Sequence, residues 1–178
     1  FTMKKNQLGN SDLILSEIGL GTWAIGGGEW GMGWGAQDEK DSIASILEGL
    51  SEGINWIDTA HAYGFGVAET SVGKALKEFK DDNVIVATKC GVLPEEDGKP
   101  KRFISRKTIL EEVDQSLRRL GRDWIDLYQI HWPFPVENLT EAWETLIELK
   151  TIGKIRWAGV CNCWETELDE LQKVSQVT

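Results

Sequence analysis

Four apolar runs that each end in a polar side chain constrain the fold of this chain more than any other feature. Each run is short and rich in β-branched or aromatic residues, which is typical of a strand buried on both faces. The runs are Ile54–Ile57, Val84–Thr88, Ile125–Ile130 and Ile155–Cys161, and the polar residues that follow them are Asp58, Lys89, His131 and Asn162. Parallel strands that each carry a polar group at the carboxyl end are the arrangement of a β/α-barrel active site.

Segments with apolar residues at helical spacing separate these strands, and several of them stop at a glycine. We expect helices over residues 37–53, around 72–79, over 105–121, around 139–153 and from about 165 onward. A further strand is expected at Glu17–Gly21, after a small hairpin formed by Gln7–Leu8 and Leu13–Leu15, and a polar loop at Leu93–Lys101. Five strands and five helices in strict alternation predict a parallel sheet with right-handed crossovers.

The spacing of the strand ends predicts a barrel larger than this chain. The ends recur about every 35 residues between Gly21 and Asn162, and eight such units would need about 280 residues, near the usual length of a (β/α)8 barrel. The expected fold is therefore α/β: an incomplete (β/α)8 TIM barrel of about five β/α units after a short N-terminal hairpin. We expect residues 1–178 to be one barrel domain whose C-terminal units are absent.

Three expectations about the intact protein follow. The natural protein should be longer by about three units. The 178-residue chain alone should be inactive, because five strands cannot close the barrel. Phe1 and Thr2, which precede Met3, should be foreign to the natural sequence.

Charge and cysteine content exclude several classes of partner and site. A net charge of −10 argues against a nucleic-acid or membrane partner, because both need a basic face. Three cysteines, two of them only one residue apart, fit no disulfide framework and favour a reducing compartment. With two histidines and no Cys-x-x-Cys pair, a zinc site is not expected. Because there is also no long apolar run, we expect a cytoplasmic protein without a metal.

Asp58, Tyr63, Lys89 and His131 would meet at one rim of such a barrel. A tyrosine is a poor general acid near neutral pH, but a nearby ammonium lowers the pKa of its hydroxyl. Lys89 could supply that ammonium, Asp58 could keep it charged, and a neutral His131 could donate a hydrogen bond to a carbonyl oxygen. Taken singly, each residue has an ordinary structural interpretation: a surface lysine, a helix cap, a core histidine or a packed aromatic ring. Their coincidence at corresponding strand ends favours chemistry, namely protonation of an oxygen that is becoming an alkoxide.

Two glycine-rich stretches match the G-x-G-x-x-A pattern of dinucleotide-binding folds, at residues 19–24 and 31–36. That pattern must follow a strand and open a helix whose N-terminus faces the pyrophosphate. The first match runs into three further glycines, and the second has no strand before it. We therefore interpret residues 24–36 as a mobile rim loop whose Trp30 and Trp34 form a pocket wall, with a disordered loop as the alternative.

At these positions the chain resembles the aldo-keto reductases over essentially its whole length. The resemblance rests on the order and spacing of Gly19–Trp23, Asp58–Gly64, Ala87–Lys89, Asp126–Pro133 and Gly153–Arg156. It implies a (β/α)8 barrel that uses NADPH without a Rossmann fold. It also implies that Tyr63 is the proton donor, that Lys89 and Asp58 tune it, and that His131 orients the carbonyl.

The resemblance also implies the remaining site residues. Asn162 is expected to bind the nicotinamide carboxamide, with Cys161 standing where the family usually has serine, and Gly21, Thr22, Trp23 and Asp58 are expected beside the cofactor. A thiol forms weaker hydrogen bonds than a hydroxyl, so the contact at Cys161 should be weakened. The expected substrate pocket is lined by Trp23, Trp30, Trp34 and Trp132.

The sequence therefore predicts an NADPH-dependent oxidoreductase that reduces an aldehyde or ketone, a small-molecule carbonyl substrate, to an alcohol. One alternative is a regulatory binding subunit on the same fold, similar to potassium-channel β subunits, with little turnover. A second alternative is a Rossmann dehydrogenase, which the two glycine-rich matches would support.

Overall fold

Five parallel strands form one curved sheet in the computed structural model, which describes residues 3–28 and 30–177. Phe1 and Thr2 therefore lie outside the described residues. The strands are hydrogen-bonded in the order β3-β4-β5-β8-β9, so each neighbour in space is also the next strand of the sheet along the chain. They span Leu20–Gly21 (β3), Trp56–Asp58 (β4), Ile85–Cys90 (β5), Ile125–Ile130 (β8) and Ile155–Val160 (β9).

This order distinguishes the two parallel folds that the sequence left open. A Rossmann sheet reverses its strand order at a switch point, whereas the strands here follow chain order throughout, as in a β/α barrel. The glycine match at residues 19–24 leads from β3 into a single 3-10 turn at Ala24–Gly26, not into an α-helix. The Rossmann alternative is therefore wrong, and the expected five-unit barrel segment is confirmed.

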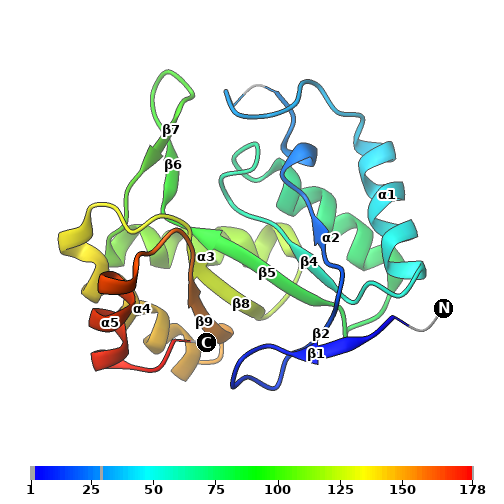
Figure 1. Ribbon diagram of the computed structural model, residues 1–178. Coiled ribbons are helices and arrows are strands. Elements are labelled where there is room, and N and C mark those ends of the chain that lie inside the picture. Colours follow the sequence, from blue (N-terminus) through cyan, green and yellow to red (C-terminus); the bar gives the residue numbers. More distant parts are fainter. Residues whose placement is uncertain (1–2, 29, 178) are drawn as a thin grey trace.

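In the described part of the chain, five α-helices alternate with the strands and pack against one another in chain order along the outer face of the sheet (Figure 1). They span Glu39–Ser51 (α1), Val67–Phe79 (α2), Arg106–Leu120 (α3), Leu139–Thr151 (α4) and Glu165–Val174 (α5), with a 3-10 turn at Val136–Asn138 before α4. Local sequence signals set several of their ends. Asp38 caps α1 through its side chain, Ser105 and Thr108 form a capping box at the start of α3, and Gly121 ends α3 in the left-handed conformation.

The main core lies between the sheet and these helices. Its largest fully buried side chains include Ile57 of β4, Ile109 of α3, Tyr128 of β8 and Trp143 of α4. Burying an aliphatic or aromatic side chain of this size contributes about 1.5–3 kcal/mol. Helices α2 and α3 approach closely at Gly73, where a Cβ would lie 2.1 Å from the Arg119 carbonyl oxygen.

Two short hairpins flank the sheet at opposite ends (Figure 1). The N-terminal one pairs Lys5–Gln7 (β1) with Ile14–Ser16 (β2), as the sequence predicted. The second pairs Val92–Pro94 (β6) with Pro100–Arg102 (β7). The expectation of an irregular polar loop at residues 93–101 is therefore wrong. The missed signal is Asp97-Gly98, a dipeptide typical of hairpin turns, in which Gly98 has a φ of 78°.

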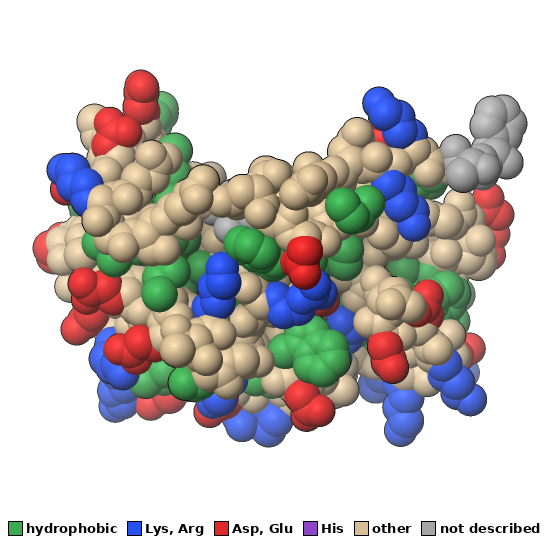
Figure 2. All heavy atoms as spheres, turned by 90° about the horizontal axis from the view of Figure 1, so that it is seen from below, with side chains coloured by type: hydrophobic (Ala, Val, Ile, Leu, Met, Phe, Trp, Pro, Cys, Tyr) green, Lys and Arg blue, Asp and Glu red, His purple; other side chains and the backbone are tan. Residues whose placement is uncertain are grey.

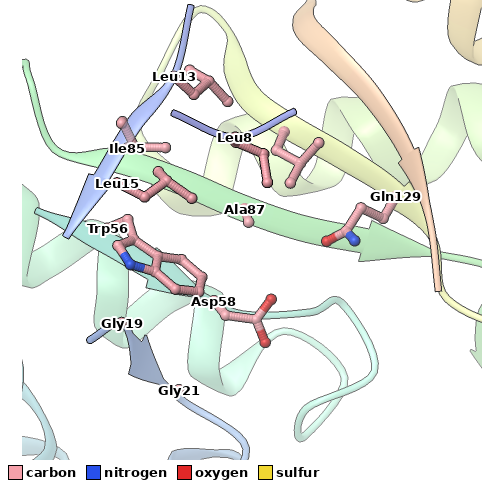
Figure 3. A pocket seen from close by; sticks show the side chains of 11 residues that line it. Leu8, Leu13, Leu15, Gly19, Gly21, Trp56, Asp58, Ile85, Ala87 and Gln129 are labelled. Atoms are coloured by element: carbon pink, nitrogen blue, oxygen red, sulfur yellow. The ribbon is translucent and has the colours of Figure 1, made fainter. Parts of the chain in front are cut away.

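The inner face of the sheet is a concave, mostly apolar surface around a cavity of about 470 Å³. Leu8, Leu13 and Leu15 of the N-terminal hairpin region cover one end of it, and Asp58 is the charged residue among its described lining side chains (Figure 3). Figure 2 shows the molecule from the end opposite the β6–β7 hairpin, where acidic and basic side chains are interspersed. None of the helices in the described part of the chain has the length and apolar character needed to cross a membrane.

Candidate active site

Asp58 and Lys89 form a partly buried ion pair at the carboxyl ends of β4 and β5. Asp58 pairs with Ala87 in the parallel ladder, and Lys89 lies two residues further along β5 on the same face. The Lys89 Nζ atom donates to Asp58 Oδ1 at 2.7 Å and to the carbonyl oxygen of Thr59 at 2.9 Å. Only 6% of the Lys89 side chain is exposed, so these partners keep its charge compensated away from water.

Tyr63 reaches the same ammonium from the turn that follows β4. Its backbone N–H donates to the Ala60 carbonyl oxygen at 3.1 Å, and its hydroxyl lies 3.4 Å from Lys89 Nζ. Burial raises the pKa of the Tyr63 hydroxyl above its usual 10, while the charge of Lys89 acts in the opposite direction. The expectation that Lys89 lowers this pKa is thus met for its own contribution, but desolvation outweighs it, and the phenol keeps its proton throughout the neutral range.

His131 completes the group from the end of β8. Its backbone N–H donates to the Cys90 carbonyl oxygen at 2.9 Å, and its ring meets the Tyr63 ring edge-on with centroids 5.8 Å apart. Burial, helped by the charges of Lys89 and Arg102, lowers the pKa of His131 to about 3. The imidazole is therefore neutral at physiological pH. Its Nδ1 atom is buried and has no hydrogen-bond partner among the described residues.

A pocket of about 580 Å³ opens beside Tyr63 and His131. Three of the four expected tryptophans line it, namely Trp23, Trp30 and Trp132. Trp34 is not among the described lining residues; it packs edge-on against Trp23 with ring centroids 5.6 Å apart. The other lining residues, which the sequence did not reveal, are Met32, Ala62, Val92, Pro100 and Arg102.

The geometry can therefore perform one kind of chemistry: proton transfer to an oxygen held beside Tyr63, His131 and the ammonium of Lys89. A model of the Aldo/keto reductase family matches residues 17–177. The chain belongs to this family.

Two curated bacterial proteins are similar in sequence to this chain. The chain is 46% identical over 174 residues to the aldo-keto reductase YhdN of Bacillus subtilis, covering 97% of this chain and 51% of that protein. It is 45% identical over 173 residues to the NADH-specific methylglyoxal reductase of Escherichia coli, covering 90% and 52% respectively. The chain thus spans about half the length of the curated relatives it matches.

A solved structure shows the same fold. The glycerol dehydrogenase AKR11B4 from Gluconobacter oxydans superposes with a TM-score of 0.85 at 40% identity, covering 97% of this chain and 53% of that one. The family to which the chain belongs consists of oxidoreductases that use a nicotinamide cofactor.

The expected cofactor residues of this aldo-keto reductase chain differ in how open they are. Asn162 is exposed at the end of β9, where its Nδ2 donates to the His131 carbonyl oxygen at 2.7 Å and to Cys161 Sγ at 3.2 Å. Trp23 is 42% exposed, and Gly21 has open space where a side chain would project. Thr22, by contrast, is fully buried, and its hydroxyl donates to the Asp58 carbonyl oxygen at 3.1 Å. Thr22 can therefore fix the end of β3 against β4, but its side chain is not open to a ligand.

A second polar cluster, which the sequence did not reveal and which includes His61, lies directly behind the Tyr63 turn. Arg119 of α3 forms an ion pair with Glu69 of α2 at 2.7 Å, and the same Arg119 nitrogen lies 3.0 Å from His61 Nδ1. Thr88, next to Lys89, donates to the other Glu69 oxygen at 2.7 Å. Burial lowers the pKa of His61 to about 4, so the ring is neutral and its Nδ1 can accept from Arg119. The cluster joins α2, α3, β5 and the turn that carries Tyr63.

Proposed function

We propose that this chain forms the proton-donating half of the active site of a carbonyl reductase, with Tyr63 as the general acid. The observation that carries the proposal is the position of Lys89 Nζ, 2.7 Å from Asp58 Oδ1 and 3.4 Å from the Tyr63 hydroxyl. An ammonium held between a carboxylate and a phenol stabilises the phenolate that remains after Tyr63 gives up its proton. A positioned general acid of this kind contributes about 10²–10⁴-fold to the rate.

His131 has a different role in this proposal. A neutral imidazole can donate an N–H to the carbonyl oxygen of the substrate without adding a second full charge beside Lys89. The low pKa of His131, about 3, keeps the ring in that form. His131 therefore orients and polarises the carbonyl, and Tyr63 delivers the proton.

The residues of the rim also fit a nicotinamide cofactor. The Asn162 amide is exposed beside His131, and its carbonyl oxygen has no hydrogen-bond partner among the described residues. We propose that Asn162 and Cys161, at the end of β9, hold the carboxamide end of NADPH, and that Gly21 and Trp23, at the end of β3 on the opposite edge of the sheet, lie beside the cofactor. When bound, the cofactor supplies the hydride that reduces the carbonyl carbon. Asp58 would lie beside it while keeping Lys89 charged.

The substrate is proposed to be a small aldehyde or ketone held in the tryptophan-lined pocket. Turnover of a panel of carbonyl compounds by the intact protein, followed with NADPH and NADH in parallel, tests the function and the cofactor preference together. The comparison of cofactors matters because one relative is described as NADH-specific. Slow cofactor oxidation with every carbonyl compound tried would overturn the proposal in favour of a regulatory binding subunit.

A further inference from the structure

The substrate pocket contains one charged side chain among its described lining residues, Arg102 of β7. The remaining lining is aromatic or aliphatic except for Tyr63 and His131, the two groups assigned to the carbonyl oxygen. A single cation in an apolar pocket is therefore the feature that can distinguish one carbonyl compound from another.

Arg102 is exposed, and its guanidinium stacks against the aromatic side chains beside it. Its guanidinium carbon lies 3.7 Å from the centre of the Trp132 ring and 5.9 Å from that of Phe134. Its backbone pairs with Val92 across the β6–β7 hairpin, and the next residue, Phe103, donates to the Gly91 carbonyl oxygen at 3.1 Å. A guanidinium stacked on an aromatic face keeps its N–H edge available for hydrogen bonds in its own plane.

The charge of Arg102 is also uncompensated. Among the described residues no carboxylate forms an ion pair with it and no acceptor forms a hydrogen bond with it, whereas Lys99 and Arg106 nearby in the sequence are paired with Asp97 and Glu148. Its influence reaches the reacting groups, because it is one of the charges that lower the pKa of His131. In a chain of net charge −10, an unpaired arginine held against a pocket wall is suited to receive an anion from outside.

We propose that Arg102 is a specificity-determining residue that binds a carboxylate on the carbonyl substrate, so that the preferred substrates are aldehydes or ketones bearing an acid group. This inference rests on the proposed reductase function and adds the substrate class. The planar guanidinium offers two parallel N–H groups that match the two oxygens of a carboxylate. The apolar pocket between Arg102 and His131 would hold the carbon skeleton that joins the acid to the carbonyl.

A matched pair of substrates tests this proposal on the intact protein: 4-carboxybenzaldehyde and its methyl ester, which have similar shape but differ in charge. Wild-type protein should have the higher kcat/KM for the acid. Arg102→Gln should lower kcat/KM for the acid by about 10–100-fold, mainly through KM, because a charge-assisted hydrogen-bonded pair is lost. The same variant should change kcat/KM for the ester less than about threefold.

Lys101→Gln is the matched control, since it removes the same charge from the adjacent position of β7, which alternation directs to the other face of the hairpin. Lys101→Gln should leave kcat/KM unchanged for both the acid and the ester. Arg102→Lys keeps the charge but loses the planar fork, so it should recover only part of the preference for the acid. Equal losses of kcat/KM for the acid and the ester in Arg102→Gln would overturn the proposal. An effect of Lys101→Gln as large as that of Arg102→Gln would also overturn it.

A binding measurement separates this inference from the proposed function. Quenching of tryptophan fluorescence by benzoate and by benzamide requires no turnover and reports on Trp132 and its neighbours. Benzoate should bind wild-type protein more tightly than benzamide does, and Arg102→Gln should weaken benzoate binding about tenfold while leaving benzamide unchanged. If this pattern appears without any carbonyl reduction, the reductase proposal fails and the anion site stands. If carbonyl compounds are reduced but benzoate and benzamide bind alike, the role of Arg102 is wrong.

Discussion

The Lys89 ammonium lies 3.4 Å from the Tyr63 hydroxyl, close enough to stabilise a phenolate but not enough to reverse the effect of burial on the tyrosine. The pKa of Tyr63 is raised because desolvation is the largest contribution, and Lys89 offsets part of it. In the proposed role of Tyr63 as a general acid, which starts protonated and ends deprotonated, burial and the Lys89 charge act at different stages of the reaction. Burial keeps the proton in place before the reaction, and the ammonium lowers the energy of the charge that appears when the proton leaves.

Replacement of Tyr63 by phenylalanine should remove the proposed proton donor while preserving the ring that packs near Trp30 and His131. We expect kcat for carbonyl reduction to fall by about 10²–10⁴-fold. Cofactor affinity, measured by fluorescence titration of the intact protein, should stay within about twofold, because in the proposed site the hydroxyl acts on the substrate oxygen and not on the cofactor. Activity within a few-fold of wild type would show that another group donates the proton.

Replacement of Lys89 by methionine should shift the pH profile of reduction as well as its rate. Lys89 lowers the pKa of Tyr63, so its removal should raise that pKa further. Because reduction needs the protonated phenol, activity is lost as the pH rises through this pKa, and in the variant that loss should occur at higher pH. The value of kcat should also fall, since the phenolate loses its counter-charge. A pH–rate profile whose alkaline limb stays in place would contradict the coupling of Lys89 to Tyr63.

Both histidines should remain neutral well below their ordinary pKa of about 6.5. Burial holds the pKa of His61 at about 4 and that of His131 at about 3. In proton NMR spectra of the intact protein, neither imidazole C2–H resonance should titrate between about pH 5 and pH 8. A resonance that moves with a midpoint near pH 6.5 would show that its ring is open to solvent.

The same lowered pKa values make the fold sensitive to acid. Between about pH 6.5 and pH 4 the unfolded chain binds protons at His61 and His131 that the native chain does not, so stability falls as the pH falls. Each histidine should account for about 2 kcal/mol of that loss between pH 7 and pH 5. Urea unfolding of wild type and of His61→Gln at both pH values isolates this contribution. Glu112, whose pKa burial raises to about 8, makes the fold more stable as the pH falls. This opposite effect is the same in wild type and in His61→Gln, so comparing the two proteins cancels it.

Arg119→Met should destabilise the protein far more than the loss of an exposed ion pair does. It would leave the carboxylate of Glu69, which is fully buried, without its cation, at a cost of about 3–5 kcal/mol. Lys74→Met is the control, because the Lys74–Glu39 pair is about half exposed and should be worth no more than about 1 kcal/mol. Urea unfolding midpoints compare the two variants. Similar losses of stability in the two variants would mean that water compensates the charge of Glu69 in solution.

Cys161→Ser tests the cofactor residues. The Asn162 amide donates to Cys161 Sγ at 3.2 Å, and a hydroxyl is a stronger acceptor than a thiol. The serine should hold the Asn162 amide more firmly and tighten cofactor binding by about 1 kcal/mol, or roughly fivefold. A titration of the protein with NADPH, followed by tryptophan fluorescence, measures this change in affinity. Unchanged or weaker binding would show that this side chain does not act through Asn162.

Local patterns in the sequence determined much of this protein. The apolar runs that end at Asp58, Lys89 and His131 mark the strand ends, because a buried parallel strand must be apolar until it reaches the rim. Ser105 and Gly121 mark the ends of α3, because capping depends only on neighbouring backbone groups. The alternation of strands and helices then gave the parallel order of the sheet.

Tertiary structure decided the features that depend on residues far apart in the chain or on the exclusion of water. The ion pair between Glu69 and Arg119 joins residues 50 positions apart, and no local pattern links them. Arg102 lines the pocket because the β6–β7 hairpin, which the sequence analysis did not predict, stacks it on Trp132. Trp34 instead packs against Trp23. The direction of the Tyr63 pKa shift had the same origin. A sequence shows that an ammonium is near, but only the packed structure shows how much water is excluded, and here that exclusion is the larger effect.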